Sequence, residues 1–282
     1  MKIGFCALSW LEPDGSADPG WFAELRAIGY DGVEIPIVRG TIDDYARLGE
    51  ALDKAELRRT ALTVMPLGRN PISGDDSERR AGFEHIAWAI AAAHALGAEM
   101  LVGPIHQTLG VFTGEPPSPI ELARLAAFHR HAGEVAARHR IGIAVEPMNR
   151  FECHILNRMD ALARHLEAVD HPSMGALYDT FHANIEESDP VAALLENAHV
   201  VGHVHISESH RGVPGSGHVN WPAIFPALKQ MNYRGWLTVE VFGRAVPAFA
   251  AAARVWRDLA EGRSAVCRRS YDHVRQGWEN AK

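Results

Sequence analysis

The chain has 282 residues, and its 28 lysines and arginines against 35 aspartates and glutamates give a net charge of −7 with neutral histidines. Proteins that bind duplex nucleic acid take most of their affinity from lysine and arginine contacts to phosphate, so this charge argues against a nucleic-acid partner. A composition of 47% hydrophobic, 22% charged and 8% aromatic residues excludes a disordered or collagen-like protein and is typical of a globular one.

The cysteine content and the apolar runs give an expectation about the compartment. Cys6, Cys153 and Cys267 are odd in number and widely spaced, which fits neither a disulfide framework nor a cysteine-rich zinc site. The apolar run from Ile3 to Leu11 is too short for a secretory signal, and no stretch reaches the roughly 18 consecutive apolar residues of a membrane span. We therefore expect a soluble, cytoplasmic protein with no membrane partner.

Short apolar runs alternate with longer amphipathic stretches eight times along the chain. The predicted strands are Lys2–Leu8, Gly32–Ile37, Arg59–Met65, Glu99–Pro104, Ile141–Glu146, Met174–Asp179, Val200–Ile206 and Trp236–Phe242. The predicted helices are Pro19–Ile28, Ile42–Ala55, Asp76–Leu96, Ile120–Arg138, Arg158–Ala168, Pro190–Asn197, Pro222–Met231 and Val246–Leu259.

Nearly continuous apolar strands that alternate with helices indicate a parallel sheet covered on both faces. Eight such units in about 260 residues predict an α/β fold, a closed (β/α)8 TIM barrel, although an open doubly wound sheet would give a similar pattern. No linker or shift in composition divides the chain, so we predict a single domain over residues 1–282.

Four successive predicted strands end in polar residues, at the edge where a barrel of this type carries its active site. These residues are Glu146, Asp179, His205 and Glu240. Each residue alone could equally cap a helix, pair with an arginine or lie in the core. Three carboxylates at the ends of buried strands together require a positive partner, which favours a divalent metal. Three carboxylates and one imidazole suit Mn²⁺, Mg²⁺ or Co²⁺ better than a thiolate-preferring ion.

Further polar residues follow the same strands and could surround the metal with groups that bind hydroxyls. Arg150 and Glu152 follow the fifth strand, His182 follows the sixth, and Arg211 lies in the loop after the seventh. The arrangement would suit a small polyol. Arg150 and Glu152 could instead pair with each other or with neighbours on the surface, as loop charges commonly do.

Two loops, Gly103–Ser118 and Glu208–Asn220, are longer than ordinary connections and are expected to carry function. The second loop contains Gly212, Gly215 and Gly217, whose spacing matches no phosphate-binding pattern. We interpret this glycine-rich stretch as a turn-rich lid.

His203, Cys6 and Cys153 are interpreted as structural. His203 lies two residues before His205 on the same face of a strand, so it is expected in the core or in support of His205. No histidine and aspartate pattern recommends Cys6 or Cys153 as a nucleophile.

Three segments carry a resemblance to a known family. The segments VEPMNRFE (145–152), LYDTFHANIEE (177–187) and HVHISESHRG (203–212) resemble the ketose 3-epimerases, the D-tagatose, D-allulose and L-ribulose 3-epimerase group of the xylose isomerase-like barrels. MKIG at 1–4 and VEVF at 239–242 also fit, so the resemblance covers most of the chain. The chain departs at Cys6, where some members have tyrosine or histidine, and at residues 103–108, which leaves the chain length of the ketose open.

The resemblance implies a role for each residue of the predicted site. The metal ligands would be Glu146, Asp179, His205 and Glu240, with Mn²⁺ first and Mg²⁺ or Co²⁺ as alternatives. Glu146 and Glu240 would also move the proton, and Glu152, His182 and Arg211 would hydrogen-bond the reacting end of the sugar. The family also implies a homo-oligomer, a dimer or a tetramer.

The chemistry of epimerisation supports this assignment independently. Inverting a carbon beside a carbonyl requires removal of its proton and return of a proton from the opposite face, so two bases are needed. Glu146 and Glu240 end strands that are three apart in a ring of eight, so they can flank a sugar while a metal polarises its oxygens. We predict an isomerase, a metal-dependent 3-epimerase of free ketoses that works through an enediolate.

Three alternatives stay open. The nearest is an aldose–ketose or hydroxypyruvate-type isomerase, or a keto-inositol dehydratase, on the same metal barrel, with only Glu152, His182 and Arg211 against it. A metal-dependent hydrolase like endonuclease IV would need more ligands and a basic groove, which the net charge of −7 disfavours. A non-catalytic sugar-binding barrel would be expected to lose one of the two strand-end glutamates, and this chain keeps both.

Overall fold

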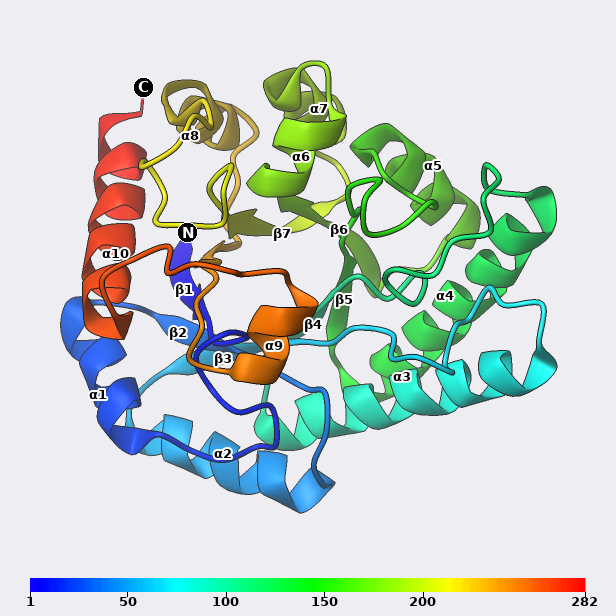
Figure 1. Cartoon of the computed structure of the whole chain (residues 1–282), viewed down its shortest axis with the longest axis horizontal. Coiled ribbons are helices and arrows are strands. Elements are labelled where there is room, and N and C mark those ends of the chain that lie inside the picture. Colours follow the sequence, from blue (N-terminus) through cyan, green and yellow to red (C-terminus); the bar gives the residue numbers. More distant parts are fainter. Residues whose placement is uncertain (282) are drawn as a thin grey trace.

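The computed structural model describes residues 1–281, and within them eight parallel strands pair in chain order while the last pairs with the first (Figure 1). The strands are β1 (Lys2–Cys6), β2 (Gly32–Pro36), β3 (Arg58–Leu62), β4 (Met100–Gly103), β5 (Gly142–Val145), β6 (Met174–Asp179), β7 (Val201–Ile206) and β8 (Trp236–Val239). The closed ring confirms the predicted (β/α)8 barrel and rules out the open sheet. Lys282, the last residue of the predicted domain, lies outside the described residues.

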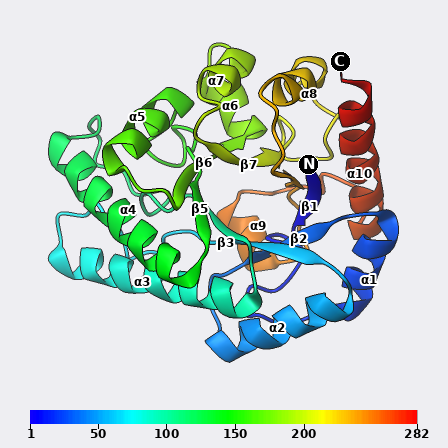
Figure 2. The ribbon, with the colours of Figure 1, turned by 180° about the vertical axis from the view of Figure 1, so that it is seen from behind.

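Most of the helices surround the barrel on its outer side (Figures 1 and 2). They are α1 (Pro19–Ile28), α2 (Ile42–Lys54), α3 (Asp76–Leu96), α4 (Pro119–His139), α5 (Met159–Val169), α6 (Thr180–Glu186), α7 (Pro190–Glu196), α8 (Trp221–Gln230), α9 (Pro247–Ala252) and α10 (Arg263–Asn280). Within the described part of the chain, no helix is long and apolar enough to cross a membrane.

Local sequence determines where several of these helices begin. At α2 the Thr41 side chain accepts a hydrogen bond from the backbone N–H of Asp44, whose carboxylate accepts one from the N–H of Thr41. Ser118 and Glu121 repeat this reciprocal arrangement at α4. Each pair satisfies N–H groups that the first helical turn leaves without partners. The end of the β4–α4 loop at Ser118 is therefore fixed by the helix cap.

The barrel interior is filled by a small apolar layer made of Cys6, Leu62, Val102, Ala144 and Leu177. A second and much larger core lies between the sheet and the helices. Alternate residues of a strand point to the same face, so Glu146 and Asp179 follow Ala144 and Leu177 on the inner side. The apolar layer thus forms a floor, and the polar strand ends lie above it at the mouth of the barrel.

Two helices were missing from the predicted elements. Helix α6 begins immediately after β6, because the Asp179 side chain accepts hydrogen bonds from the backbone N–H groups of Phe181 and His182. Helix α10 packs against α1, α8 and β1, and Figures 1 and 2 show it along the outer side of the barrel. Its sequence is mostly polar, and its inner face buries only a few residues, among them Val266 and Val274.

Several predicted elements are shorter in the structure, among them one helix and the last strand. Helix α9 ends at Ala252 instead of Leu259, and it lies in front of the strands in Figure 1. Strand β8 ends at Val239 instead of Phe242. Glu240 therefore stands just beyond the strand, and its backbone N–H still donates to the carbonyl of Ile206 at the end of β7.

Candidate metal centre and active site

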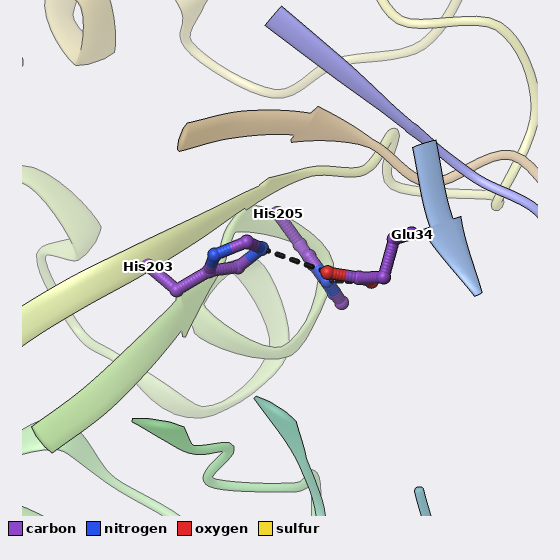
Figure 3. A group of neighbouring side chains, drawn as sticks. All are labelled: Glu34, His203 and His205. Carbon is purple, nitrogen blue, oxygen red and sulfur yellow. Dashed lines mark hydrogen bonds and ion pairs between the residues drawn. The ribbon is translucent and has the colours of Figure 1, made fainter. Parts of the chain in front are cut away.

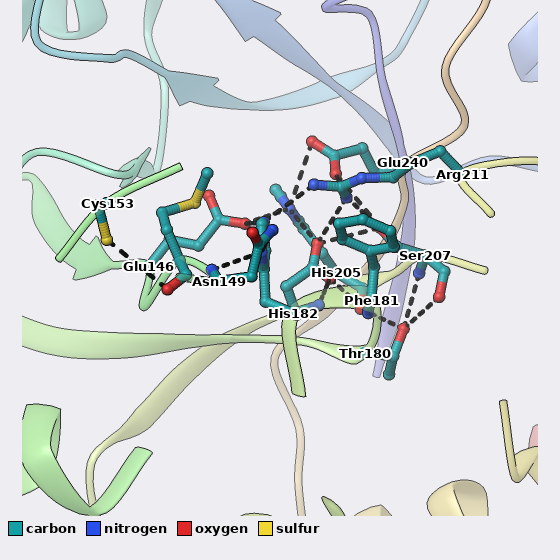
Figure 4. Close-up of polar contacts among 12 residues, drawn as sticks. Glu146, Asn149, Cys153, Thr180, Phe181, His182, His205, Ser207, Arg211 and Glu240 are labelled. Carbon is teal, nitrogen blue, oxygen red and sulfur yellow. Dashed lines mark hydrogen bonds and ion pairs between the residues drawn. The ribbon is translucent and has the colours of Figure 1, made fainter. Parts of the chain in front are cut away.

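The four strand-end residues converge at the mouth of the barrel. Glu146 follows β5, Asp179 ends β6, His205 lies near the end of β7 and Glu240 follows β8. All four are buried, and each offers one ligand atom within 4.8 Å of the others. Figure 4 shows the side chains of Glu146, His205 and Glu240 directed into one shared space. The structure thus brings together every residue of the predicted metal set.

His205 presents its two ring nitrogens to different partners. Its Nε2 lies 2.8 Å from Oε1 of Glu34. Its Nδ1 lies 3.8 Å from Glu146 Oε1 and 3.6 Å from an oxygen each of Asp179 and Glu240. Within residues 1–281 this buried Nδ1 makes no hydrogen bond. Buried polar atoms are normally satisfied, so a nitrogen without a partner among three carboxylates fits a bound divalent cation.

Asp179 uses its two oxygens for different purposes. Oδ1 caps helix α6, accepting from the N–H groups of Phe181 at 2.6 Å and His182 at 3.1 Å. Oδ2 faces the cluster, 3.0 Å from Oγ of Ser207 and 3.2 Å from Nη1 of Arg211. Burial alone would raise the pKa of Asp179, but Arg211 above all holds it below its usual value. This carboxylate is ionised and available as a ligand.

Arg211 supplies the fixed positive charge of the site. Its Nη1 donates to Oδ2 of Asp179 and to Oε2 of Glu240, and its Nη2 lies 2.9 Å from Nε2 of His182. The side chain is almost fully buried, and the carboxylates around it raise its pKa despite that burial. A guanidinium in this position compensates part of the negative charge that the carboxylates bring into the barrel.

The pKa values of the two glutamates are shifted in the opposite direction to that of Asp179. Burial and the carboxylates of Asp179 and Glu240 raise the pKa of Glu146 well above its ordinary value. Burial also raises the pKa of Glu240, although Arg211 and His205 oppose the shift. Carboxyl groups with raised pKa values are better able to hold a proton near neutral pH, which suits acid–base chemistry.

His182 is held as a neutral ring with a hydrogen-bond donor against each of its nitrogens. Its Nδ1 accepts the backbone N–H of Asn149 at 3.1 Å, and its Nε2 lies 2.9 Å from Nη2 of Arg211, which also can only donate. Burial and the Arg211 guanidinium lower the pKa of His182 to about 3. Nε2 faces the cluster, 3.6 Å from Oε1 of Glu146. His182 therefore presents Nε2 to the mouth of the barrel beside the guanidinium of Arg211.

Glu152 and Arg150 have different surroundings in the structure, although the sequence predicted the same two possible roles for both. The half-buried Glu152 lies near enough to Arg211 to help raise the pKa of that arginine. Its backbone carbonyl accepts the N–H of Gly110 at 2.8 Å, which ties it to the loop after β4. Arg150 instead forms a two-pronged surface pair with Glu186, with Nη2 2.9 Å from Oε2. Arg150 thus forms a surface ion pair and does not contribute to the site.

The glycine-rich loop after β7 is arranged around a buried carboxylate. Glu208 accepts hydrogen bonds from the N–H groups of Ser209 and Gly215, each at 2.8 Å, and from Nε1 of Trp221 at 2.9 Å. These and other donors lower the pKa of Glu208 to about 2 although its burial opposes ionisation. Sequence analysis overlooked Glu208, which fixes the loop that carries Arg211.

Glu34 is a second residue that sequence analysis overlooked. It lies in the middle of β2, is fully buried and contacts both His203 and His205 (Figure 3). A lone carboxylate in the otherwise apolar run GVEIP was the available signal, because a buried carboxylate needs a specific partner. His203 itself lies in the core, as expected, and it contacts this carboxylate at 3.0 Å.

All three cysteines are free and buried in the described residues. Sγ of Cys6 lies 3.9 Å from Oε1 of Glu240, and burial raises the pKa of the Cys6 thiol. Cys153 does have a histidine neighbour, since Nε2 of His106 lies 3.2 Å from its Sγ. Burial nevertheless raises the pKa of Cys153 to about 12, so the nucleophilic thiolate does not form near neutral pH.

Comparisons with known proteins agree with this fold. Residues 22–261 match the family model of the xylose isomerase-like TIM barrel, and the chain belongs to that family. A probable ketose 3-epimerase of Synechocystis sp. is 30% identical over 279 residues, covering 99% of this chain and 97% of that protein. An L-ribulose 3-epimerase of Methylomonas sp. is 32% identical over 251 residues, with coverage of 88% and 87%.

A solved structure of a relative is equally similar. The D-allulose 3-epimerase from Methylomonas sp. in complex with D-allulose has a TM-score of 0.89 at 30% identity, covering 98% of this chain and 96% of that one. These relatives are carbohydrate epimerases, a class of isomerase. The resemblance to the ketose 3-epimerases is thereby confirmed.

Proposed function

We propose that this protein is a metal-dependent isomerase that epimerises free ketoses at C3, with substrates of the D-tagatose, D-fructose/D-allulose and L-ribulose class. The observation that supports this best is the position of Glu146 and Glu240, two buried glutamates with raised pKa values in one cluster. They approach from β5 and β8, which are three strands apart in the ring. Two bases in this arrangement are what inversion of a carbon next to a carbonyl requires.

The metal would be held by Glu146, Asp179, His205 and Glu240. Three carboxylates and one imidazole form a hard donor set, for which we propose Mn²⁺, with Mg²⁺ or Co²⁺ as alternatives. When bound, such an ion polarises the carbonyl and hydroxyl oxygens of the substrate and stabilises the negative charge of the enediolate.

The protein's own groups would perform the proton transfers. One of Glu146 and Glu240 removes the C3 proton, and the other, in its protonated form, returns a proton to the opposite face. Nε2 of His182 and the guanidinium of Arg211 face the same space, and Glu152 lies near that guanidinium. We propose that these three residues hold the reacting end of the sugar. A fixed orientation keeps the C3–H bond between the two glutamates.

NMR in D₂O tests this proposal directly. The Mn²⁺-loaded protein is incubated with D-fructose, D-tagatose and L-ribulose beside a sample stripped with EDTA, and the sugars are analysed after removal of the protein. We expect deuterium at C3 together with the C3 epimer, and loss of both after stripping. Exchange at C1 with formation of an aldose would replace the proposed epimerase with an aldose–ketose isomerase. No exchange on any free sugar would favour the dehydratase or the sugar-binding barrel.

Two further predictions accompany the proposed function. The family resemblance predicts a homo-oligomer, either a dimer or a tetramer, and light scattering after size-exclusion chromatography measures its mass. We also predict a cytoplasmic location, which fractionation of the source cells with a specific antibody would test.

A further inference from the structure

Glu34 occupies an unusual position for a charged residue. Its side chain is fully buried inside the barrel, below the strand-end cluster, and it belongs to none of the residues proposed to touch metal or sugar. Its neighbours in register are Cys6 on β1 and Thr60 on β3. Burying a carboxylate is costly unless it is well hydrogen-bonded, so its partners indicate its role.

The two oxygens of Glu34 have separate partners. Oε1 lies 2.8 Å from Nε2 of His205, and Oε2 accepts a hydrogen bond from Oγ1 of Thr60 at 2.8 Å. Nε2 of His203 lies 3.0 Å from Oε2 (Figure 3). The carboxylate is thus held from both sides, and Oε1 is directed at a single ring nitrogen.

This contact determines how His205 can present itself to the cluster above. A carboxylate oxygen only accepts hydrogen bonds, so a proton on Nε2 is favoured and the lone pair is left on Nδ1. Nδ1 is the atom that lies 3.6 Å from Asp179 and Glu240 and has no hydrogen bond within residues 1–281. The same contact fixes the rotation of the ring, because the two nitrogens lie on opposite sides of the imidazole.

We infer that Glu34 is a positioning residue, which holds His205 in the Nε2–H tautomer with Nδ1 directed at the metal site. The inference rests on the metal centre of the proposed function and extends it to a residue on the other side of the barrel. Hydrogen-bond partners of metal-bound histidines typically contribute 10- to 100-fold to metal affinity. Glu34 is not a catalytic residue, since it is separated from the cluster by the His205 ring.

A second metal ion between Glu34, His203 and His205 is the competing interpretation, because their donor atoms also lie within 4.8 Å of one another. The 2.8 Å separation of His205 Nε2 and Glu34 Oε1 is an ordinary hydrogen-bond length. Ligands about 2.1 Å from one ion in tetrahedral geometry would lie roughly 3.4 Å apart. All three side chains are also fully shielded from solvent. The hydrogen-bonded support is therefore the better interpretation.

Metal binding in the absence of sugar tests the inference. Isothermal titration calorimetry with Mn²⁺ measures the affinity and the stoichiometry of metal binding. The samples are the metal-stripped wild type, Glu34→Gln and the control Glu99→Gln. Glu99 is a suitable control because it is a part-buried, ion-paired glutamate beside Lys2 and Arg58. We expect one ion per chain, binding about 10- to 100-fold weaker in Glu34→Gln, and wild-type affinity in Glu99→Gln. Equal affinity in Glu34→Gln, or two ions per wild-type chain, would overturn the inference.

Two further measurements separate positioning from a general effect on folding. Long-range ¹H–¹⁵N NMR of the Mg²⁺-loaded wild type should show His205 with its proton on Nε2, and a proton on Nδ1 would contradict the inference. Should Glu34→Gln fail to fold, Thr60→Val, which removes only the hydroxyl that orients Glu34, is expected to weaken Mn²⁺ binding measurably. Unchanged binding in that variant would count against the inference. Normal metal binding without epimerase activity would refute the proposed function alone.

Discussion

The guanidinium of Arg211 lies over the ring of Phe181, with its central carbon 3.8 Å from the ring centroid. The same carbon lies 4.4 Å from the centroid of the Phe242 ring. Cation–π contacts and exclusion of water by two aromatic rings strengthen the hydrogen bonds that the guanidinium makes. Arg211 therefore has a single orientation, with its donors aimed at the carboxylates.

This orientation predicts the effect of Arg211→Lys. A lysine keeps the charge but loses the planar fork and the contacts to both rings. We expect the loss of one charged hydrogen bond, about 1.5–3 kcal/mol, which lowers kcat/KM about 10- to 150-fold, mainly through KM. Steady-state kinetics on the preferred ketose measures it. Arg150→Lys, at the surface pair with Glu186, is the matched control and should retain wild-type kinetics.

Replacement of Glu240 by glutamine should remove epimerisation while the barrel stays folded. The amide cannot exchange a proton at C3, so we expect a decrease in kcat of at least about 100-fold. Activity assays and circular dichroism measure the two effects. Glu167→Gln, at an exposed glutamate on α5, should have no effect. Normal turnover in Glu240→Gln would remove Glu240 from the mechanism.

Removal of the metal should destabilise the folded protein. Four buried ligands bind the ion only when they are assembled, so an ion at 100 times its Kd adds about 2.7 kcal/mol of stability. For a chain of this size that corresponds to a decrease in Tm of roughly 5–10 °C on chelation. Thermal unfolding with EDTA and after re-addition of Mn²⁺ measures it. A Tm that does not respond to EDTA or Mn²⁺ would contradict the proposed centre.

A buried histidine away from the site predicts a pH dependence of stability. Nε2 of His85 lies 2.9 Å from the carbonyl of Val64, and its Nδ1 lies 3.2 Å from Nη1 of Arg69. Burial, with Arg69 adding to it, lowers the pKa of His85 to about 4. The pKa in the unfolded chain is about 6.5, so the unfolded state binds the proton first. The contribution of neutral His85 to the stability of the folded protein is thus fully present above pH 6.5 and is lost as the pH falls toward 4.

The measurement is the free energy of unfolding in urea between pH 7.5 and 4.5, for wild type and His85→Gln. We expect the wild type to lose up to about 1.4 kcal/mol per pH unit more than the variant across this window. His199→Gln, at an exposed histidine, should follow the wild-type curve. Parallel curves for wild type and His85→Gln would show that His85 is not the group responsible.

The sequence carried strong signals for the barrel and for the strand-end cluster. Strand-length apolar runs and a polar residue at the end of each of four successive strands are local features, so Glu146 and Asp179 were found without a structure. Glu34 was not found, because its partner His205 is 171 residues away and only closure of the ring brings the two together. Helix α6 was missed for a related reason, since Asp179 both ends a strand and caps a helix.

The partners of charged residues in the loops could not be predicted from the sequence either. Arg150 and Glu152 lie two residues apart in one motif, but one pairs with Glu186 at the surface and the other lies near Arg211. Which way each side chain turns depends on the path of the loop. That path depends on contacts such as the one between Glu152 and Gly110, which connect separate segments.

The hydrogen bond between Glu34 and His205 joins β2 to β7 across the interior of the ring. The four strand-end residues themselves all come from the second half of the chain, from β5 to β8. A fragment that begins at Ile141 would contain every one of them and still lack the carboxylate that orients His205. The two halves of the barrel are therefore unequal but interdependent: the second half carries the chemical groups, and the first half holds one of them in place.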